Sequence, residues 1–358
     1  MKLYLVIQSM DGGGAQRVLS ILANHWSLRG YEVTLATFRN EHSFYPLENR
    51  VKHLKLGLDS QSIAKKKVWF DNLFRINTLT KSIKEEQADV VISFMTTANI
   101  LATLASKRAN VPIVIAERTN YNFLNSRIWR IFRRMVYPFS DALVVLSTYD
   151  KEKYAFHKNS HIIYNPIALS CNHREVKREK IILAVGRLEY LKGFDLLIDA
   201  FSRLKQEGWK VIIVGEGKDR EALEAQVIRC GLEASVEMPG ATQNMEPYYR
   251  KASIFVLSSR IEGFPNVLIE AMGYGAAPIA MDCLTGPRDI IQNKKNGLLV
   301  EVENSVELSI AMESLMDNPD QLQAYATHAK NVNSALMINT ISDKWLGVIS
   351  MVIKNKGV

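Results

Sequence analysis

Short apolar runs alternate with segments of helical period along almost the whole chain. The apolar runs lie at 3–7, 31–38, 89–94, 112–117 and 141–147, and then at 181–187, 210–217, 235–240, 254–259 and 277–281. Runs of this length, rich in Val, Ile and Leu, are typical of parallel strands that are buried on both faces. The segments between them, such as 15–23 and 194–205, have the spacing of crossover helices. The pattern predicts an α/β fold with doubly wound parallel sheets.

The length and the position of one polar stretch divide this pattern into two parts. A chain of 358 residues exceeds what one hydrophobic core usually organises. Residues 171–180 are polar and charged, with no periodicity. We therefore expect two Rossmann-like domains that face a central cleft. The expected boundaries are an N-terminal domain at 1–164, a linker at 165–180, a second domain at 181–335, and a C-terminal helix at 336–358 that packs back toward the first domain.

Composition favours a soluble globular protein. Hydrophobic residues make up 47% and charged residues 23%, which are ordinary values for this class. The first apolar run is too short for a signal peptide, and no run approaches the roughly 18 residues of a membrane-spanning helix. Cys171, Cys230 and Cys283 have neither disulfide-framework nor zinc-site spacing. We expect a cytoplasmic protein that does not span a membrane.

Positive charge is concentrated in the first half of the chain. Residues 1–164 hold 23 Lys and Arg against 13 Asp and Glu, whereas the remainder holds 22 against 24. Such a field attracts nucleic acid, anionic lipid or phosphorylated ligands without choosing between them. Two stretches, 65–84 and 127–134, mix the cations with aromatic residues, as basic amphipathic helices on membranes do. The alternative is a solvated cationic face over an ordinary buried apolar stripe.

The segment 262–270 carries the most specific candidate chemistry. Glu262 follows a strand, Pro265 suits the first turn of a helix, and Glu270 lies inside that helix. Backbone N–H groups at the start of a helix form an anion site, here flanked by two carboxylates. The alternative is an ordinary amphipathic helix with two solvated glutamates.

Glycine turns follow several of the predicted strands. Gly12, Gly13 and Gly14 follow the first strand, but they match neither a dinucleotide fingerprint nor a Walker loop. A ligand-facing turn and a tight turn that needs no ligand both stay open there. In the second half, Gly186-Arg187, Lys192-Gly193 and the turn at 215–217 occupy the corresponding positions.

With these motifs in this order, the chain resembles the retaining GT-B glycosyltransferases of family 4 over nearly its whole length. In that family the residues matching Arg187 and Lys192 hold the donor diphosphate, so with Glu262 they are the implied catalytic residues. Fixed cations at this place stabilise the charge that grows on the leaving diphosphate. The resemblance implies a donor-binding set of Gly13, Gly14, Arg187, Lys192, Gly215, Glu262, Gly263, Phe264, Pro265, Asn266, Val267 and Glu270.

Within the family, 43–49 and 129–143 are similar to N-acetylgalactosaminyltransferases that extend undecaprenyl-diphosphate-linked glycan in the bacterial N-glycan pathway. The acceptor-binding set that we infer is Lys65, Lys66, Lys67, Arg75, Glu117, Arg118, Arg127 and Arg130. Many relatives have a histidine where this chain has Arg118. Two roles stay open for that arginine, namely binding an acceptor phosphate and forming a structural ion pair.

The resemblance implies a retaining, UDP-sugar-dependent hexosyltransferase attached peripherally to the inner face of the inner membrane. Its expected partners are a UDP-N-acetylhexosamine donor, with N-acetylgalactosamine favoured, a polyprenyl-diphosphate-linked oligosaccharide acceptor and an anionic membrane surface. We expect no nucleic acid partner and a monomer or weak dimer. The chain has no Asp-x-Asp, so we expect neither a metal ion nor another cofactor. The alternatives are a lipopolysaccharide-core, O-antigen or capsule transferase with another nucleotide hexose, and a non-catalytic nucleic-acid-binding protein.

Overall fold

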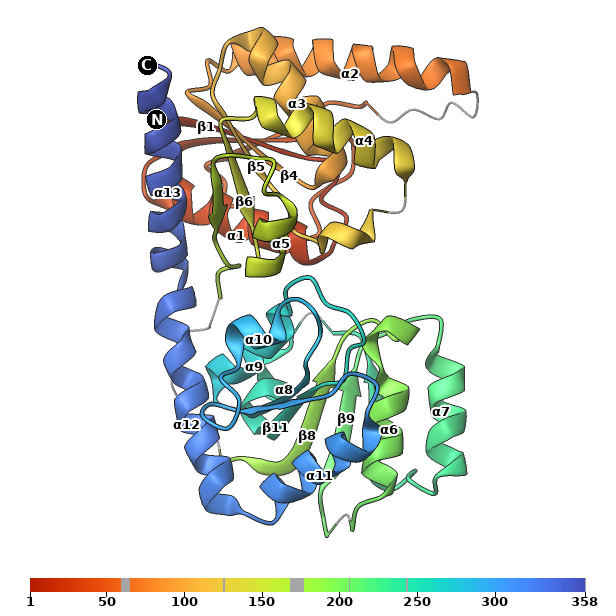
Figure 1. The fold of residues 1–358 in the computed structure, drawn as a ribbon. Coiled ribbons are helices and arrows are strands. Elements are labelled where there is room, and N and C mark those ends of the chain that lie inside the picture. Colours follow the sequence, from red (N-terminus) through yellow and green to blue (C-terminus); the bar gives the residue numbers. More distant parts are fainter. Residues whose placement is uncertain (59–64, 125, 168–176, 206, 243, 358) are drawn as a thin grey trace. The chain divides into compact units, whose positions relative to one another are not determined.

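A computed structural model describes residues 1–58, 65–124, 126–167, 177–205, 207–242 and 244–357. The chain forms two compact units. The first consists of Met1–Pro166 together with Ile338–Val358, and the second of Ile167–Met337. The last helix therefore belongs to the unit that contains the N-terminus (Figure 1).

The first unit is built on a seven-stranded parallel sheet with the order β3-β2-β1-β4-β5-β6-β7. Its strands are β1 (Lys2–Ile7), β2 (Glu32–Thr37), β3 (Val51–Lys55), β4 (Val90–Phe94), β5 (Ile113–Ala116), β6 (Ala142–Val145) and β7 (Ser160–Ile162). In the register, Leu5 lies beside Leu35 on one side and Ile92 on the other. These central positions are fully buried, as the continuous apolar runs predict.

Helices cover both faces of this sheet. They are α1 (Gly14–Leu28), α2 (Lys65–Glu85), α3 (Thr96–Ala109), α4 (Arg127–Val136), α5 (Thr148–Lys153) and α13 (Ile338–Asn355), with 3-10 turns η1 (Tyr121–Phe123) and η2 (Tyr137–Phe139). The core on one face takes side chains from α2, α3 and α4. On the other face α13 packs against α1, where Trp26 and Trp345 meet edge to face and the Trp26 indole donates to Ser342 at 3.0 Å.

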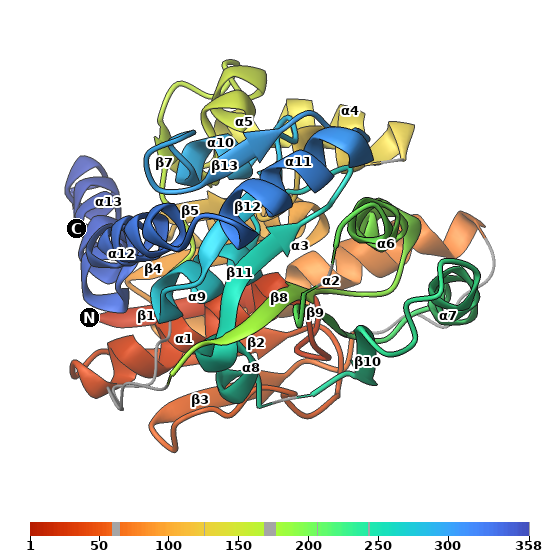
Figure 2. The same cartoon turned by 90° about the horizontal axis from the view of Figure 1, so that it is seen from below.

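The second unit is built on a six-stranded parallel sheet with the order β10-β9-β8-β11-β12-β13, which can be followed in Figure 2. Its strands are β8 (Glu179–Val185), β9 (Lys210–Val214), β10 (Val236–Gly240), β11 (Ala252–Leu257), β12 (Ala277–Met281) and β13 (Leu298–Val300). Because β8 and β11 are neighbours in the middle of the sheet, the loops that follow them leave the same edge side by side.

The helices of this unit also lie on both faces. They are α6 (Phe194–Ser202), α7 (Arg220–Arg229), α8 (Glu246–Lys251), α9 (Asn266–Tyr274), α10 (Pro287–Ile290), α11 (Ser305–Met316) and α12 (Pro319–Leu336), with the 3-10 turn η3 (Tyr190–Lys192). Helices α6, α7 and α11 pack on one face, and α8 and α9 on the other. Among the described residues of the whole chain, no helix combines the length and the apolar character needed to cross a bilayer.

The predicted α/β fold with two parallel-sheet, Rossmann-like units is confirmed. Three strands, β3, β7 and β13, were not predicted, and all three lie at sheet edges. An edge strand pairs on one side only, and β3 and β7 carry polar residues such as Lys52, His53 and Ser160. β3 and β7 therefore lack the continuous apolar run that identifies a central strand, and β13 is apolar but only three residues long.

Candidate functional site

The candidate site of the second unit is built from loops at the carboxyl edge of its sheet. Residues 186–193 follow β8, 215–217 follow β9, and 258–265 follow β11. Parallel strands bring these loops to one edge, which is where ligands bind in α/β folds. The sheet order therefore explains how motifs far apart in the sequence come together.

A partly buried ion pair joins two of these loops. The ammonium of Lys192, the last residue of η3, donates to Oε1 of Glu262 at 2.6 Å. The Ser259 hydroxyl donates to the same oxygen at 2.7 Å. The Glu262 side chain is only 8% exposed, while Lys192 keeps 25% of its side chain exposed. The pair thus presents a fixed cation whose position is set by a carboxylate that is held in turn by Ser259.

Arg260, which was not among the residues expected from the sequence, also joins these two loops. Arg260 donates to both carboxylate oxygens of Asp195 at 2.9 and 2.7 Å and to the carbonyl oxygen of Tyr190 at 2.7 Å. Its guanidinium also lies 3.9 Å from the Tyr190 ring centroid. Bidentate pairs of this kind are among the strongest hydrogen-bonded contacts in proteins. Arg260 is therefore a positioning residue for the loop that ends at Lys192.

Two glycines allow the backbones of this site to approach each other. At Gly193, φ is +63°, and a Cβ would lie 2.0 Å from the carbonyl oxygen of Ser258. At Gly215, a Cβ would lie 1.8 Å from the carbonyl oxygen of Gly186. Any larger residue would push these loops apart, so both glycines have a packing reason for their place in the turns.

The second glutamate of the motif is also buried and held. Helix α9 begins at Asn266, so Pro265 precedes its first residue, and Glu270 lies at its fifth position. Oε2 of Glu270 accepts a hydrogen bond from the Tyr249 hydroxyl at 2.9 Å, and the Tyr249 ring stacks on Tyr274 with centroids 5.6 Å apart. Glu262 and Glu270 are each 7% exposed. The alternative of two solvated glutamates is therefore wrong.

The other predicted donor residues differ in exposure. The Arg187 side chain is 77% exposed and pairs with Glu189 at 3.2 Å. Phe264 and Pro265 are buried, whereas Gly263, Asn266 and Val267 are half-buried. In the first unit, Gly13 precedes α1 and Gly14 begins it. The Tyr45 hydroxyl bonds both the N–H and the carbonyl of Gly13, at 3.2 and 3.1 Å.

The cationic acceptor candidates lie on two helices of the first unit. The side chains of Lys65, Lys66 and Lys67, at the start of α2, fall outside the described part of the structure. Arg75 lies farther along α2, where its Nε donates to the carbonyl of Leu58 at 3.0 Å. Arg127 and Arg130 are exposed on α4. Their contact with an acceptor stays a prediction.

The remaining acceptor candidates, Glu117 and Arg118, lie inside the first unit at the end of β5. Thr96 donates to Glu117 at 2.8 Å, and the Tyr137 hydroxyl also donates to this carboxyl. Burial raises the pKa of Glu117.

Arg118 is buried, and the groups to which it donates hydrogen bonds are neutral. Nη1 donates to the carbonyl of Ile163 at 3.2 Å and to Oδ1 of Asn165 at 3.1 Å, and the guanidinium faces the rings of Phe94 and Trp345. Burial lowers the pKa of Arg118 to about 9. The charge of the neighbouring Glu117 opposes this lowering, and both roles considered for Arg118, an acceptor-phosphate contact and a structural ion pair, stay predictions.

Cys283 lies beneath the candidate site as a neutral thiol. Its Sγ donates to the carbonyl of Ser259 at 2.8 Å, and burial together with the Glu262 charge raises its pKa to about 12. Among the described residues, no group of three or more His, Cys, Asp and Glu side chains has the arrangement of a metal site.

Comparison with known proteins identifies the family. Residues 12–170 match the family model "Glycosyltransferase Family 4" and residues 169–332 match "Glycosyl transferases group 1". A Campylobacter jejuni α-1,4-N-acetyl-D-galactosaminyltransferase, named for a GalNAc-α-(1→4)-GalNAc-α-(1→3)-diNAcBac-PP-undecaprenol substrate, is 32% identical over 98% of this chain and 99% of its own.

A second relative and a solved structure extend the comparison. The N-acetylgalactosamine-N,N'-diacetylbacillosaminyl-diphospho-undecaprenol 4-α-N-acetylgalactosaminyltransferase of the same organism is 29% identical over 92% of this chain and 94% of its own. Anabaena HepE, solved in complex with UDP, is 18% identical and superposes with a TM-score of 0.80 over 98% of this chain and all of its own. The non-catalytic reading loses its support, and the chain is a GT-B hexosyltransferase that belongs to glycosyltransferase family 4.

Proposed function

We propose that this enzyme transfers N-acetylgalactosamine from UDP-N-acetylgalactosamine to a polyprenyl-diphosphate-linked oligosaccharide, with retention of the anomeric configuration. The observation that carries the donor side is the pair of buried glutamates, one bound to Lys192 and one to Tyr249. The acceptor side rests on two relatives, each named for an undecaprenol-linked glycan.

The second-unit site suits a nucleoside diphosphate as leaving group. When the glycosidic bond to the diphosphate breaks, negative charge grows on its oxygens, and fixed cations stabilise that charge. Lys192 is fixed by Glu262, and the exposed Arg187 is free to reach a ligand by exchanging its surface pair with Glu189. Surface pairs of this kind contribute little to stability, so the exchange costs little. Glu270 would accept hydroxyl hydrogen bonds from the ribose, and UDP is the nucleotide bound to the structural neighbour HepE.

Helix α4 supports attachment to an anionic membrane surface. Its inner face carries the buried Val136 and the half-buried Trp129 and Phe132. A second apolar stripe faces outward, because Ile128, Ile131 and Met135 are 65%, 60% and 62% exposed. These three positions share one helix face.

Arginines border that outward stripe. Arg127, Arg130 and Arg134 are all exposed at the same three- and four-residue spacing. An apolar stripe beside cations is the composition of helices that lie in the interface of anionic bilayers. This arrangement would bring a lipid-linked acceptor and the enzyme to the same surface.

Calorimetric titration tests the donor assignment first. UDP-N-acetylgalactosamine, UDP-N-acetylglucosamine and UDP-galactose would be titrated into wild type and Glu270→Ala in buffer that contains EDTA. We expect the tightest binding for UDP-N-acetylgalactosamine and loss of that binding in the variant. Preference for UDP-galactose would favour a lipopolysaccharide-type transferase, and no binding without a divalent ion would contradict metal independence.

The acceptor assignment needs a separate transfer assay. With UDP-N-acetylgalactosamine as donor, we expect product on a polyprenyl-diphosphate-linked oligosaccharide and none on the same oligosaccharide without its lipid diphosphate. Anomeric configuration would be read from the proton coupling of the new linkage by NMR. Equal use of both acceptors, or a β-linked product, would contradict the proposal.

A further inference from the structure

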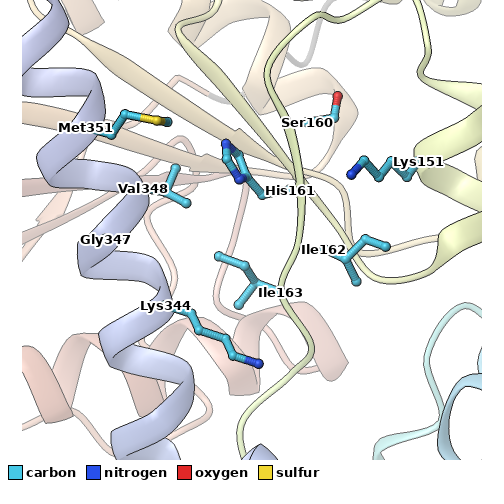
Figure 3. A pocket seen from close by; sticks show the side chains of 9 residues that line it. All are labelled: Lys151, Ser160, His161, Ile162, Ile163, Lys344, Gly347, Val348 and Met351. Carbon is cyan, nitrogen blue, oxygen red and sulfur yellow. The ribbon is translucent and has the colours of Figure 1, made fainter.

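A basic pocket lies at the far edge of the first-unit sheet from β3. Its volume is about 410 Å³, and it is lined by residues of α5, β7 and α13 together with Ile163, as Figure 3 shows. In the sheet, β4, β5 and β6 separate β7 from β1, after which Gly13 and Gly14 come. The pocket is thus distinct from that glycine turn, and its volume falls within the roughly 300–1,000 Å³ of small-molecule sites.

The charged groups of this pocket all have the same sign. Lys151 extends from α5 toward the strand, and Lys344 extends from α13 toward Ile163 (Figure 3). No residue of the lining carries a carboxylate. Among the residues that the structure describes, neither ammonium has a hydrogen-bond or ion-pair partner within the protein. Two cations around one concave surface leave a positive potential that an anion would neutralise.

A titratable ring adds a third nitrogen-bearing side chain. His161 lies on β7 and lines the same pocket, and its Nε2 is 2.7 Å from Oδ1 of Asn159. Burial and the charge of Lys151 lower the pKa of His161. The same ring would gain a favourable partner if an anion entered the pocket, so it is a local reporter of binding.

The rest of the lining is apolar. Ile162, Ile163, Val348 and Met351 contribute side chains beside the polar rim of Ser160, His161 and the two lysines. Cations at the rim and hydrocarbon within suit a ligand that carries a phosphate next to an apolar group, because each part then meets its own kind of surface.

We propose that the pocket lined by Lys151, His161 and Lys344 is a second anion site of this enzyme, which binds the phosphate group of an amphiphilic ligand. The phosphate belongs either to a lipid head group or to a small free molecule. This site is independent of the donor site proposed for the second unit, whose cations are Lys192 and Arg187.

The first arm of the test uses pyrophosphate as the probe and the ring signals of His161 as the readout. Protein with ¹³C-labelled histidine would be titrated at constant pH and ionic strength, and His161→Gln would assign the signal among the seven histidines. We expect a saturable shift of His161 in wild type, with the dissociation constant raised about tenfold or more in Lys151→Ala/Lys344→Ala. Because the readout is the ring signal of His161 in the first unit, pyrophosphate that binds in the second unit does not contribute to the measured shift.

The matched control is Lys153→Ala/Lys354→Ala. It also removes one lysine charge from each of α5 and α13, but at exposed positions outside the pocket lining. We expect wild-type affinity for this variant. An equal loss in both double variants would overturn the proposal, because it would reflect total charge rather than the pocket.

The second arm distinguishes the source of the phosphate. Flotation with vesicles of phosphatidylglycerol and phosphatidylcholine would compare the two double variants. If only the pocket variant binds the vesicles more weakly and pyrophosphate does not shift the His161 signal, the ligand is a lipid head group. If pyrophosphate shifts the His161 signal and the two variants float equally, the ligand is a small free phosphate. If His161 does not respond and the two variants float equally, the pocket is not an anion site.

Discussion

The ammonium of Lys192 lies 2.6 Å from Oε1 of Glu262, although 70 residues separate them in the sequence. Both stand in loops at the carboxyl edge of one sheet, and Ser259 and Thr285 hold the Glu262 side chain and its backbone carbonyl. A carboxylate so enclosed is stable as an anion only beside a cation. The pair therefore has two effects: it stabilises the enclosed Glu262, and it positions Lys192, which is proposed to bind the donor diphosphate.

Replacing this lysine is expected to impair both catalysis and stability. For Lys192→Ala we expect a fall in kcat of about 100-fold, because one fixed electrostatic contact to the leaving group is lost. We also expect a lower free energy of unfolding, by about 1–3 kcal/mol, because Glu262 loses its charged partner. Steady-state kinetics and urea denaturation measure the two effects. Lys210→Ala, which breaks an exposed pair with Glu237, is the control and should change neither appreciably. A kcat within threefold of wild type would remove Lys192 from the catalytic set.

Tyr249 is expected to affect donor binding without touching the donor. Tyr249→Phe removes only the hydroxyl that donates to Glu270 and keeps the ring that stacks on Tyr274. We expect donor affinity to fall about three- to tenfold, since Glu270 loses one of the bonds that orient it. Calorimetry with the UDP-sugar measures this change. Tyr325→Phe in α12 is the control, and equal weakening in both variants would show a general effect on folding instead of an effect through Glu270.

The outward stripe of α4 predicts a membrane-binding defect from a single exposed residue. Ile131→Ser should weaken binding to vesicles that contain phosphatidylglycerol by about threefold or more, because an apolar side chain is removed from the bilayer interface. Ile310→Ser in α11 is matched to it, since Ile131 and Ile310 are 60% and 59% exposed. Flotation assays compare the two. If Ile310→Ser weakens binding as much as Ile131→Ser, α4 is not the membrane contact.

The buried Glu117 predicts a pH dependence of stability. Its pKa is raised above the ordinary value of about 4.5 by burial, so the folded state holds the proton more tightly than the unfolded state. This contribution to stability is complete below about pH 4.5 and is lost as the pH rises through the raised value in the folded protein. Glu117→Gln cannot lose a proton, and it keeps oxygen and nitrogen atoms near Thr96 and Tyr137. Wild type should therefore become less stable relative to Glu117→Gln as the pH rises above 4.5. Parallel curves from urea denaturation between pH 4 and 8 would contradict a raised pKa.

Several features of this protein were determined by the sequence alone. The central strands could be predicted because burial on both faces leaves a continuous apolar run, which is a property of one short segment. Glu262 and Glu270 could be named because they stand in the loop and helix that follow such a run, and Lys192 because the resemblance to family 4 implies its role. These signals are local, so they survive without any knowledge of which segments meet.

Only the tertiary structure decided which partners these residues have. Tyr249 and Arg260 are ordinary residues in the sequence and become part of the site because neighbouring strands bring them there. Arg118 is one of the many cations of the first half, yet its guanidinium packs against the rings of Phe94 and Trp345, the latter on the last helix of the chain. Likewise, the sequence of α4 shows apolar residues on two faces, and packing against the core selects which one stays outside. Burial and hydrogen bonding depend on residues distant in the chain, so no pattern along a single segment can specify them.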